Sequence, residues 1–285
     1  MNIKELKLTE LERLQIKCGE VIMKTLPDLA ISQVSGEVKD IYHDIMWINQ
    51  APHVNWLYRA LANHPEFLIN SWRGVRPIIL SDEYKVNLNK LKSQASDFVS
   101  KFSKNFKKVR PNNKVQAIVD DFSNMLPNTL LCATSFYFGA PIAKERAVLN
   151  STYVCPKNPL EGLKMVEMVD APQSVQAIYN AAMKAHLHTG VASFYRWLGN
   201  WPEVIEVMWS NLEPMVTSKD FTEEVQKVID LSTKIVWDSG MSVKDSKCLN
   251  YANIDDVRSF LSLFRIHGNP AMLIVTSAAK AMMLD

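Results

Sequence analysis

The sequence predicts an all-α fold made of two similar helical repeats, and three observations support this prediction. Apolar residues recur every three or four positions along most of the 285-residue chain, which is the spacing of amphipathic helices. No segment alternates apolar and polar residues for long enough to indicate a convincing strand, and the nearest, 75–80, contains Pro77, which disfavours a strand. Residues 37–72 recur, without a gap, as residues 174–209. A chain of this length has room for two domains with cores of their own.

The repeat rests on twelve identical residue pairs, each 137 positions apart. These pairs are Val38/Val175, Ile41/Ile178, Tyr42/Tyr179, Met46/Met183, Val54/Val191, Tyr58/Tyr195, Arg59/Arg196, Leu61/Leu198, Asn63/Asn200, Pro65/Pro202, Glu66/Glu203 and Trp72/Trp209. Solenoid units run only roughly 20–50 residues, so this period indicates two domain-sized copies. Two such copies can pack around a pseudo-two-fold axis and enclose a pocket whose similar walls carry different side chains.

In the first half of the chain, proline and capping residues mark where the predicted helices begin and end. Leucines at mixed three- and four-residue spacing predict a helix over 4–25, which ends before Pro27. Pro65 falls in the first turn of its helix, where a missing amide costs nothing. Ser81 or Asp82 can cap the long amphipathic helix that follows. The expected helices of the first copy are 36–48, 53–63, 65–77, 82–105, 113–125 and 127–140.

The second half predicts the same series of helices. In both copies a proline, Pro127 or Pro270, is expected in the first turn of the last helix. The expected helices are 173–187, 190–200, 202–216, 219–238, 254–266 and 269–284. The segment between the copies carries Pro156 and Pro159 and few helical cues. We therefore divide the chain into an N-terminal helical extension (1–30), a first repeat (31–141), a linker (142–171) and a second repeat (172–285).

Composition narrows the function classes. The apolar fraction of 47% and the charged fraction of 22% are those of a soluble globular protein. A net charge of +2 predicts neither a nucleic-acid nor a membrane partner, and no run of about 18 apolar residues predicts a membrane span. The start of the chain lacks the apolar core of a signal peptide, so a cytoplasmic location is expected. The four cysteines are widely spaced, which argues against a disulfide framework or a metal site.

Acid/base candidates are few and lie in the turns where the two copies diverge. These turns are residues 51–58 and 188–195, and they contain His53 and His188. His267 precedes Gly268-Asn269-Pro270 at an expected helix start, where free amides suit a carboxylate or a halide. Histidine titrates near neutral pH and can exchange protons there. A hydrogen-bonded or solvated structural histidine remains the alternative at each position.

Several segments together resemble one enzyme family. VSGEVKDIYHDI, APHVNWLYRALANHPEFLINSW, the repeat of this run and the closing FRIHGNPAMLIVTSAA resemble the group I, or DehI-type, 2-haloacid dehalogenases, which accept both enantiomers. The resemblance runs from about Val34 to Leu284. It implies an all-α fold of two repeats with the active site between them. It also implies hydrolysis in which an aspartate activates a water that attacks the halogen-bearing carbon with inversion, and no metal or organic cofactor.

The resemblance indicates which residues bind substrate, and this chain differs from the family at one of them. The positions that it indicates are His53, Trp56, Asn128, Ser193, Phe194 and His267. The family carries Ser-Asp-Tyr in the second repeat, with the aspartate as base, whereas this chain has Ser193-Phe194-Tyr195. A phenyl ring cannot accept a proton, so the family mechanism cannot run unchanged. The catalytic residues are therefore unknown from sequence.

Three hypotheses remain open. The chain is a dehalogenase-like hydrolase with weak or lost activity that still binds a small ligand, for which a carboxylate is one candidate. Alternatively, it is an enzyme of different chemistry that uses His53, His188 or His267 as acid/base. Or it is a non-catalytic homologue whose interface binds a small molecule or only holds its halves together. A homodimer is also left open.

Overall fold

The computed structural model describes residues 5–143, 148–155, 158–186, 188 and 190–284. Within these ranges the secondary structure is helical, and the only extended pairing is an isolated bridge between Val109 and Met283. The all-α prediction is therefore confirmed. Pro156 of the linker and residue 187, the expected end of one helix, lie outside the described residues. No helix in the described part of the chain is both long and apolar enough to span a bilayer.

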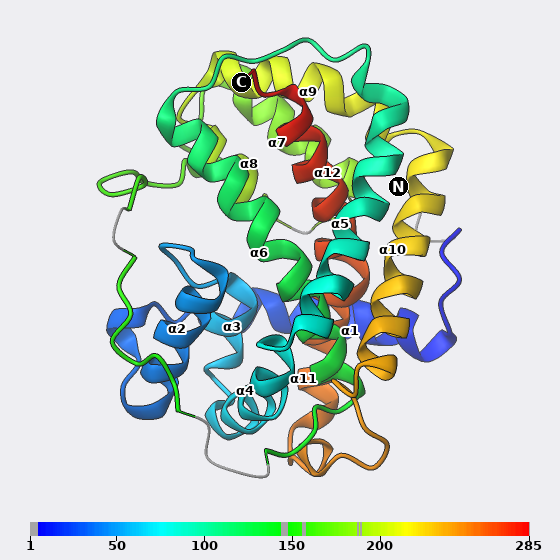
Figure 1. Ribbon diagram of the computed structural model, residues 1–285. Coiled ribbons are helices and arrows are strands. Elements are labelled where there is room, and N and C mark those ends of the chain that lie inside the picture. The colour runs from blue at the N-terminus through cyan, green and yellow to red at the C-terminus, as the bar shows by residue number, and fades with distance from the viewer. Residues whose placement is uncertain (1–4, 144–147, 156–157, 187, 189, 285) are drawn as a thin grey trace.

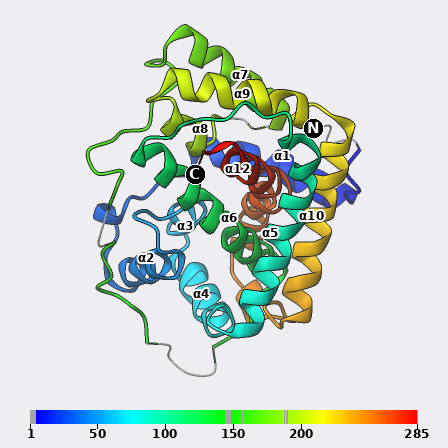
Figure 2. The same cartoon turned by 45° about the horizontal axis from the view of Figure 1, so that its top comes forward.

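The helices follow one another closely along the chain. In the first half they are α1 (Glu10–Thr25), η1 (Ile31–Gln33), α2 (Gly36–Asn49), α3 (Trp56–Leu61), α4 (Pro65–Ile79), α5 (Asp82–Ser103) and α6 (Asn113–Phe138). In the second half they are α7 (Gln173–His186), α8 (Ser193–Leu198), α9 (Pro202–Val216), α10 (Lys219–Asp238), η2 (Lys247–Leu249), α11 (Ile254–Ser262), η3 (Leu263–Gly268) and α12 (Asn269–Met282). Figures 1 and 2 show α2–α4 at one end, α7–α9 at the other, and α5, α6, α10 and α12 running between them.

The repeated sequence makes the same contacts in both copies. The hydroxyl of Tyr42 donates to the backbone carbonyls of Leu29 and Tyr58, at 3.0 and 3.5 Å. The hydroxyl of Tyr179 donates to the carbonyls 137 positions further along, at 3.2 and 3.3 Å. Edge-on packing of Tyr58 on Trp72, with ring centroids 5.7 Å apart, also recurs, at 6.2 Å. The identical pairs thus build equivalent local frameworks, while the pseudo-two-fold relation between the copies stays a prediction.

Helix α6 corrects the expectation of a break before Pro127. Pro127 lies inside one continuous helix, Asn113–Phe138. An interior proline removes one backbone hydrogen bond and costs about 3 kcal/mol. Residues 125–137 are buried on all sides, and a helix buried in this way is held by packing around its whole circumference. This packing outweighs the local cost of the proline, and α6 crosses the centre of the molecule (Figure 1).

The end of the second copy also differs from the expectation. Helices α11 and α12 are joined without a break by η3, a π-helical segment. The amide of Asn269 donates to the carbonyl of Phe264, five residues back. The expected free helix start before Pro270 is therefore absent there, because the preceding helical turns occupy this donor. Such π-segments cost helical hydrogen-bond geometry and are frequent at functional sites.

Helix α1 packs against the second copy although it belongs to the expected N-terminal extension. It lies along α11, and a Cβ placed on Gly19 would stand 2.2 Å from the backbone oxygen of Ser259. The buried guanidinium of Arg265 in η3 forms an ion pair with Glu12. Gly19 therefore permits a close approach between α1 and α11, and Glu12, near the start of α1, contacts η3.

The linker is tied to both copies at described residues. The backbone and side-chain nitrogens of Asn150 donate to Asp44 of α2, at 2.9 and 3.2 Å. The amide of Val166 donates to the carbonyl of Arg196 in α8, at 2.9 Å. These contacts fix the linker at its start and near its end. The exact boundaries of the extension, repeats and linker remain a prediction.

Candidate functional site

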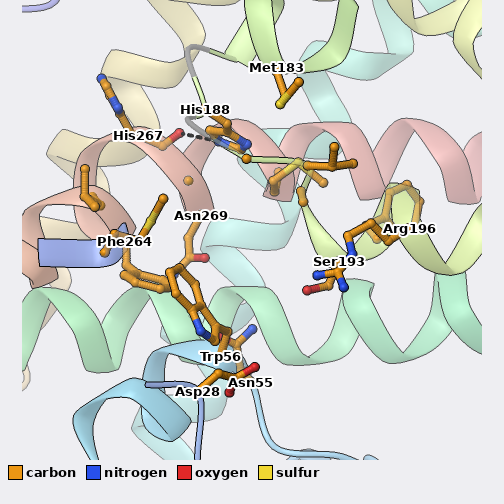
Figure 3. A pocket seen from close by; sticks show the side chains of 18 of the residues that line it. Asp28, Asn55, Trp56, Met183, His188, Ser193, Arg196, Phe264, His267 and Asn269 are labelled. Carbon is orange, nitrogen blue, oxygen red and sulfur yellow. Dashed lines mark hydrogen bonds between the residues drawn. The ribbon is translucent and has the colours of Figure 1, made fainter. Parts of the chain in front are cut away.

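A cavity of about 650 Å³ is lined by residues from both halves of the chain. We call it the chamber. The described residues that line it come from α1 (Glu20, Met23, Lys24), from the segment after α1 (Asp28), from α3 and its cap (Asn55, Trp56, Arg59), from α6 (Phe122, Leu126), from the linker (Glu167, Met168), from α7 to α8 (Met183, His188, Gly190, Val191, Ala192, Ser193, Phe194, Arg196), and from η3 and α12 (Leu263, Phe264, His267, Gly268, Asn269, Met272). Figure 3 shows the chamber from close by. Its walls combine an aromatic and methionine-rich surface with a few polar groups, as ligand sites commonly do.

The aromatic wall holds the residue at the position where the resemblance expects a base. The ring of Phe194 is fully buried and packs edge-on against Phe122, with centroids 5.4 Å apart. Trp56 also lines the chamber and packs on Phe264, with ring centroids 5.5 Å apart. Asn55 caps α3 by accepting from the amide of Leu57 at 2.9 Å, and this cap fixes where the Trp56 side chain begins. At Phe194 the wall therefore offers hydrocarbon and no proton acceptor.

The three candidate histidines lie in different places. His188 lines the chamber, and its Nε2 lies 3.4 Å from the carbonyl oxygen of His267. The imidazole of His267 points away from the other labelled side chains (Figure 3), and its Nε2 has no partner. His53 is not among the described lining residues, and its ring stands 5.8 Å from Phe122. Of these three, His188 is the one whose ring is placed to meet a ligand.

Burial weakens all three histidines as bases. It lowers the pKa of His53, His188 and His267 to about 4 in each case, because the charged imidazolium loses its hydration. Each ring is therefore neutral at pH 7. A carbonyl oxygen can only accept, so Nε2 of His188 carries the proton toward His267, and Nδ1 keeps the free lone pair. His188 can accept a proton, but less readily than a solvated imidazole.

Asn128 is buried between Tyr84 and Asn49. Its side-chain oxygen accepts from the hydroxyl of Tyr84, and its Nδ2 donates to Asn49 Oδ1 at 2.9 Å. It is not among the described lining residues. Both ends of the amide are engaged within the first copy, so its assignment to a water-positioning role stays a prediction that these contacts do not favour.

Asn269 is a polar lining residue that the sequence reasoning missed. Its side chain is 4% exposed and its Nδ2 has no hydrogen-bond partner. Figure 3 shows it beside Trp56. A buried donor left unpaired costs about 1–3 kcal/mol, so a ligand or water atom placed there would recover that cost. The only signal in the sequence was its place directly after His267-Gly268.

Two arginines at equivalent positions were also missed. Arg59 of α3 and Arg196 of α8 both line the chamber. The Nε of Arg59 lies 3.1 Å from Asp28 Oδ1, and Arg196 forms an ion pair with Glu167. Burial lowers the pKa of Arg196, and the positive charge of Arg59 lowers it further, which indicates that the two cations lie near each other. Their identity in the two copies is the signal that the sequence offers for them.

The carboxylates that line the chamber are far from Phe194 in the sequence. Those among the described lining residues are Glu20, Asp28 and Glu167. Asp28 and Glu167 are engaged by the arginines. In the described part of the chain, no cluster of three or more His, Cys, Asp or Glu side chains could hold a metal ion. The chamber thus offers two guanidiniums, the ammonium of Lys24, the carboxylate of Glu20, a neutral histidine, an unpaired amide and a large apolar wall.

Comparison with known proteins gives distant but consistent relatives. No family model matches the chain. A configuration-inverting 2-haloacid dehalogenase of Alcaligenes xylosoxydans xylosoxydans is 22% identical over 227 residues, which cover 74% of this chain and 76% of that protein. One of Pseudomonas sp. (strain 113) is 23% identical over 228 residues, covering 73% and 74%. An (R)-2-haloacid dehalogenase of Pseudomonas putida is 22% identical over 215 residues, covering 69% and 70%.

Solved structures agree on the fold. A D-2-haloacid dehalogenase in complex with L-LA aligns with a TM-score of 0.69 and 17% identity, covering 90% of this chain and 96% of that one. A mutant of a D-2-haloacid dehalogenase in complex with D-2-CPA aligns with a TM-score of 0.68 and the same identity and coverage. The chain therefore has the fold of these dehalogenase structures and is a distant homologue of 2-haloacid dehalogenases. The equivalence of Phe194 with their base stays a prediction.

Proposed function

We propose that this chain is a dehalogenase-like hydrolase whose chamber binds small 2-haloacids and hydrolyses them only weakly. The homologous 2-haloacid dehalogenases, the shared fold and the chamber lined by both halves of the chain support the substrate class. The single observation that carries the weak activity is the fully buried ring of Phe194 in the chamber wall. It fills the position that the resemblance gives to the aspartate base.

The magnitude follows from the chemistry that the ring cannot supply. When water attacks a carbon directly, a base must take its proton as the new C–O bond forms, and the halide leaves with the bonding electron pair. A positioned general base contributes typically 10²–10⁴-fold to such a step. The chamber can still hold the reacting groups together, which gives part of the rate. We therefore expect residual turnover about two to four orders of magnitude below that of an enzyme with the base.

Chloride release tests the proposal directly. The purified chain is incubated with (R)- and (S)-2-chloropropionate, while binding of the same acids is followed by calorimetry or thermal shift. We expect saturable binding and slow chloride release, about two to four orders of magnitude below that of an enzyme with the base. Turnover in the usual enzymatic range of about 1–10³ s⁻¹ would contradict the loss of activity, and absence of binding would contradict the substrate class.

A second candidate is hydrolysis that uses His188 as the base. The observation that favours it is the free lone pair on Nδ1, which follows from the contact of Nε2 with the carbonyl of His267. Because the pKa of His188 is lowered to about 4, kcat/KM should rise through that pH and stay level above it. His188→Gln should abolish any chloride release, while His53→Gln, outside the chamber lining, serves as the matched control. Equal rates in both variants would eliminate this candidate.

A further inference from the structure

We propose that the preferred ligand of the chamber is an amphipathic organic acid larger than a three-carbon haloacid, bound with its carboxylate at Arg59 and Arg196 and its apolar body on the aromatic wall. This inference deepens the proposed function by naming the substrate class of the same site. It rests on the size of the chamber, on the chemistry of its wall and on two kinds of polar group that face it.

The chamber is too large for the smallest haloacids. A three-carbon 2-chloro acid has six non-hydrogen atoms. Even at the roughly 30 Å³ that each molecule of liquid water occupies, six such atoms fill about 180 Å³. The chamber measures about 650 Å³, which is in the range that encloses ligands of several times that size. A three-carbon acid would leave most of the apolar wall against water.

The apolar wall should bind a ligand more tightly as the apolar part of that ligand becomes longer. Its rings and thioethers come from several elements, namely Trp56, Phe122, Met183, Phe194, Phe264 and Met272. Burying one methylene of a ligand against such a surface stabilises binding by about fourfold. Methionine side chains adapt to ligands of different outline. Affinity should therefore rise with chain length until the chamber is filled.

The arginine pair identifies the head group. Arg59 and Arg196 occupy equivalent positions of the two copies and line the same chamber. Their partners Asp28 and Glu167 have side chains that are 44% and 54% exposed. When a guanidinium turns from its carboxylate to a ligand, water can therefore replace the lost hydrogen bonds of that carboxylate. The Nε of Arg196 is buried with no hydrogen-bond partner. Guanidinium groups bind carboxylates through two parallel hydrogen bonds, and an anion placed near both arginines also relieves their mutual repulsion.

Asn269 supplies an independent sign of a polar ligand. It is 4% exposed, lines the chamber, and keeps an unpaired Nδ2. The apolar side chains of Trp56 and Phe264 lie next to Asn269 (Figure 3). The Asn269 amide is therefore placed to donate to a second polar atom of the ligand. An organic acid can supply such an atom, whereas a hydrocarbon cannot.

Calorimetric titration with unreactive acids tests this inference. The probes are butanoate, hexanoate, octanoate and the neutral octanamide. Because none carries a halogen, the result does not depend on turnover, and chloride release remains the separate test of the proposed function. We expect affinity to rise about fourfold per methylene, and octanamide to bind at least tenfold more weakly than octanoate. Equal affinity along the series, or equal binding of acid and amide, would overturn the inference.

Variants locate the head group. Arg59→Gln and Arg196→Gln should each reduce the preference for octanoate over octanamide by tenfold or more, and Arg196→Lys should keep part of it. The matched control is Arg73→Gln, because Arg73 pairs with Glu37 outside the chamber lining and is 23% exposed, close to the 25% of Arg196. Melting curves establish that each variant is folded, and the lysine variant retains the test if a glutamine variant is not. An unchanged preference in the folded arginine variants would overturn the assignment.

Discussion

Replacing Arg76 by methionine tests the buried charge cluster that joins α2, α4 and the linker. Asp44 is fully buried and accepts from Arg76 Nε at 2.6 Å and from Arg76 Nη2 at 2.9 Å. Trp72 Nε1 and the amide of Asn150 donate to the same carboxylate, each at 2.9 Å. Arg76→Met removes two charge-assisted hydrogen bonds and leaves a buried anion without a cation. Breaking a buried pair on one side costs about 3–5 kcal/mol. Three donors remain, namely Trp72 Nε1 and both nitrogens of Asn150, and they place the expected loss near about 3 kcal/mol.

Urea denaturation measures this loss. Arg73→Met is the matched control, because the more exposed pair of Arg73 with Glu37 should contribute less than about 1 kcal/mol. Burial alone would raise the pKa of Asp44, but hydrogen bonds from Arg76 and Asn150 hold it below its ordinary value. The carboxylate therefore stabilises the fold above its unfolded pKa, and this contribution is lost as pH falls through the folded pKa. A loss below about 1 kcal/mol for Arg76→Met at pH 7 would refute this reasoning.

Two further predictions concern α1 and α6. Gly19→Ala gains helix propensity of about 1 kcal/mol, but its Cβ would stand 2.2 Å from the backbone oxygen of Ser259. We expect a lower melting temperature and weaker octanoate binding, and a more stable variant would contradict the close contact. Burial and the charge of Asp120 raise the pKa of Asp121 to about 7, so Asp121 stabilises the fold at acid pH and this contribution is lost as pH rises through about 7. Asp121→Asn should therefore stabilise the protein by about 2 kcal/mol more at pH 8 than at pH 5, and equal urea midpoint shifts at the two pH values would exclude this.

Local signals were sufficient to predict most helices. Helices α9 and α10 have the bounds that the sequence predicted, 202–216 and 219–238. Pro202 sits at the start of α9, and the side chain of Ser218 accepts from the amide of Phe221 to cap α10. These determinants act within one helical turn, so they can be recognised without knowledge of the fold.

The errors arose where tertiary packing decides. Pro127 marks a helix start by local rules, yet it lies inside α6 because the surrounding core holds the helix together. The π-helical segment η3 has no distinct apolar period, so the sequence did not predict it. In this segment the imidazole of His267 points away from the other labelled side chains, and its carbonyl oxygen lies next to His188 (Figure 3). A π-helical segment has more residues per turn than an α-helix. It therefore changes the direction in which the side chains after it point.

The chamber could be predicted only in part for the same reason. Trp56, Ser193, Phe194 and His267 do line it, and the first three lie within the two turns in which the copies diverge. Arg59 and Arg196 are one of the twelve identical pairs, and identity between the copies does not mark a residue as part of a site. Their meeting at one chamber depends on how the copies pack, which no spacing within either copy reveals. The substrate-binding roles of all these residues remain predictions.

The measurement that tests the central claim most directly is chloride release from 2-chloropropionate by Phe194→Asp against Phe194→Asn. The two side chains have nearly the same size, and only the carboxylate can take a proton from water. Burial raises the pKa of such an acid, so the rates are measured from pH 7 to pH 9. If Phe194 stands where the base belongs, Phe194→Asp should release chloride at least about 10²-fold faster than Phe194→Asn and the unmodified chain. Equal rates in the two folded variants, or fast turnover by the unmodified chain, would contradict the account.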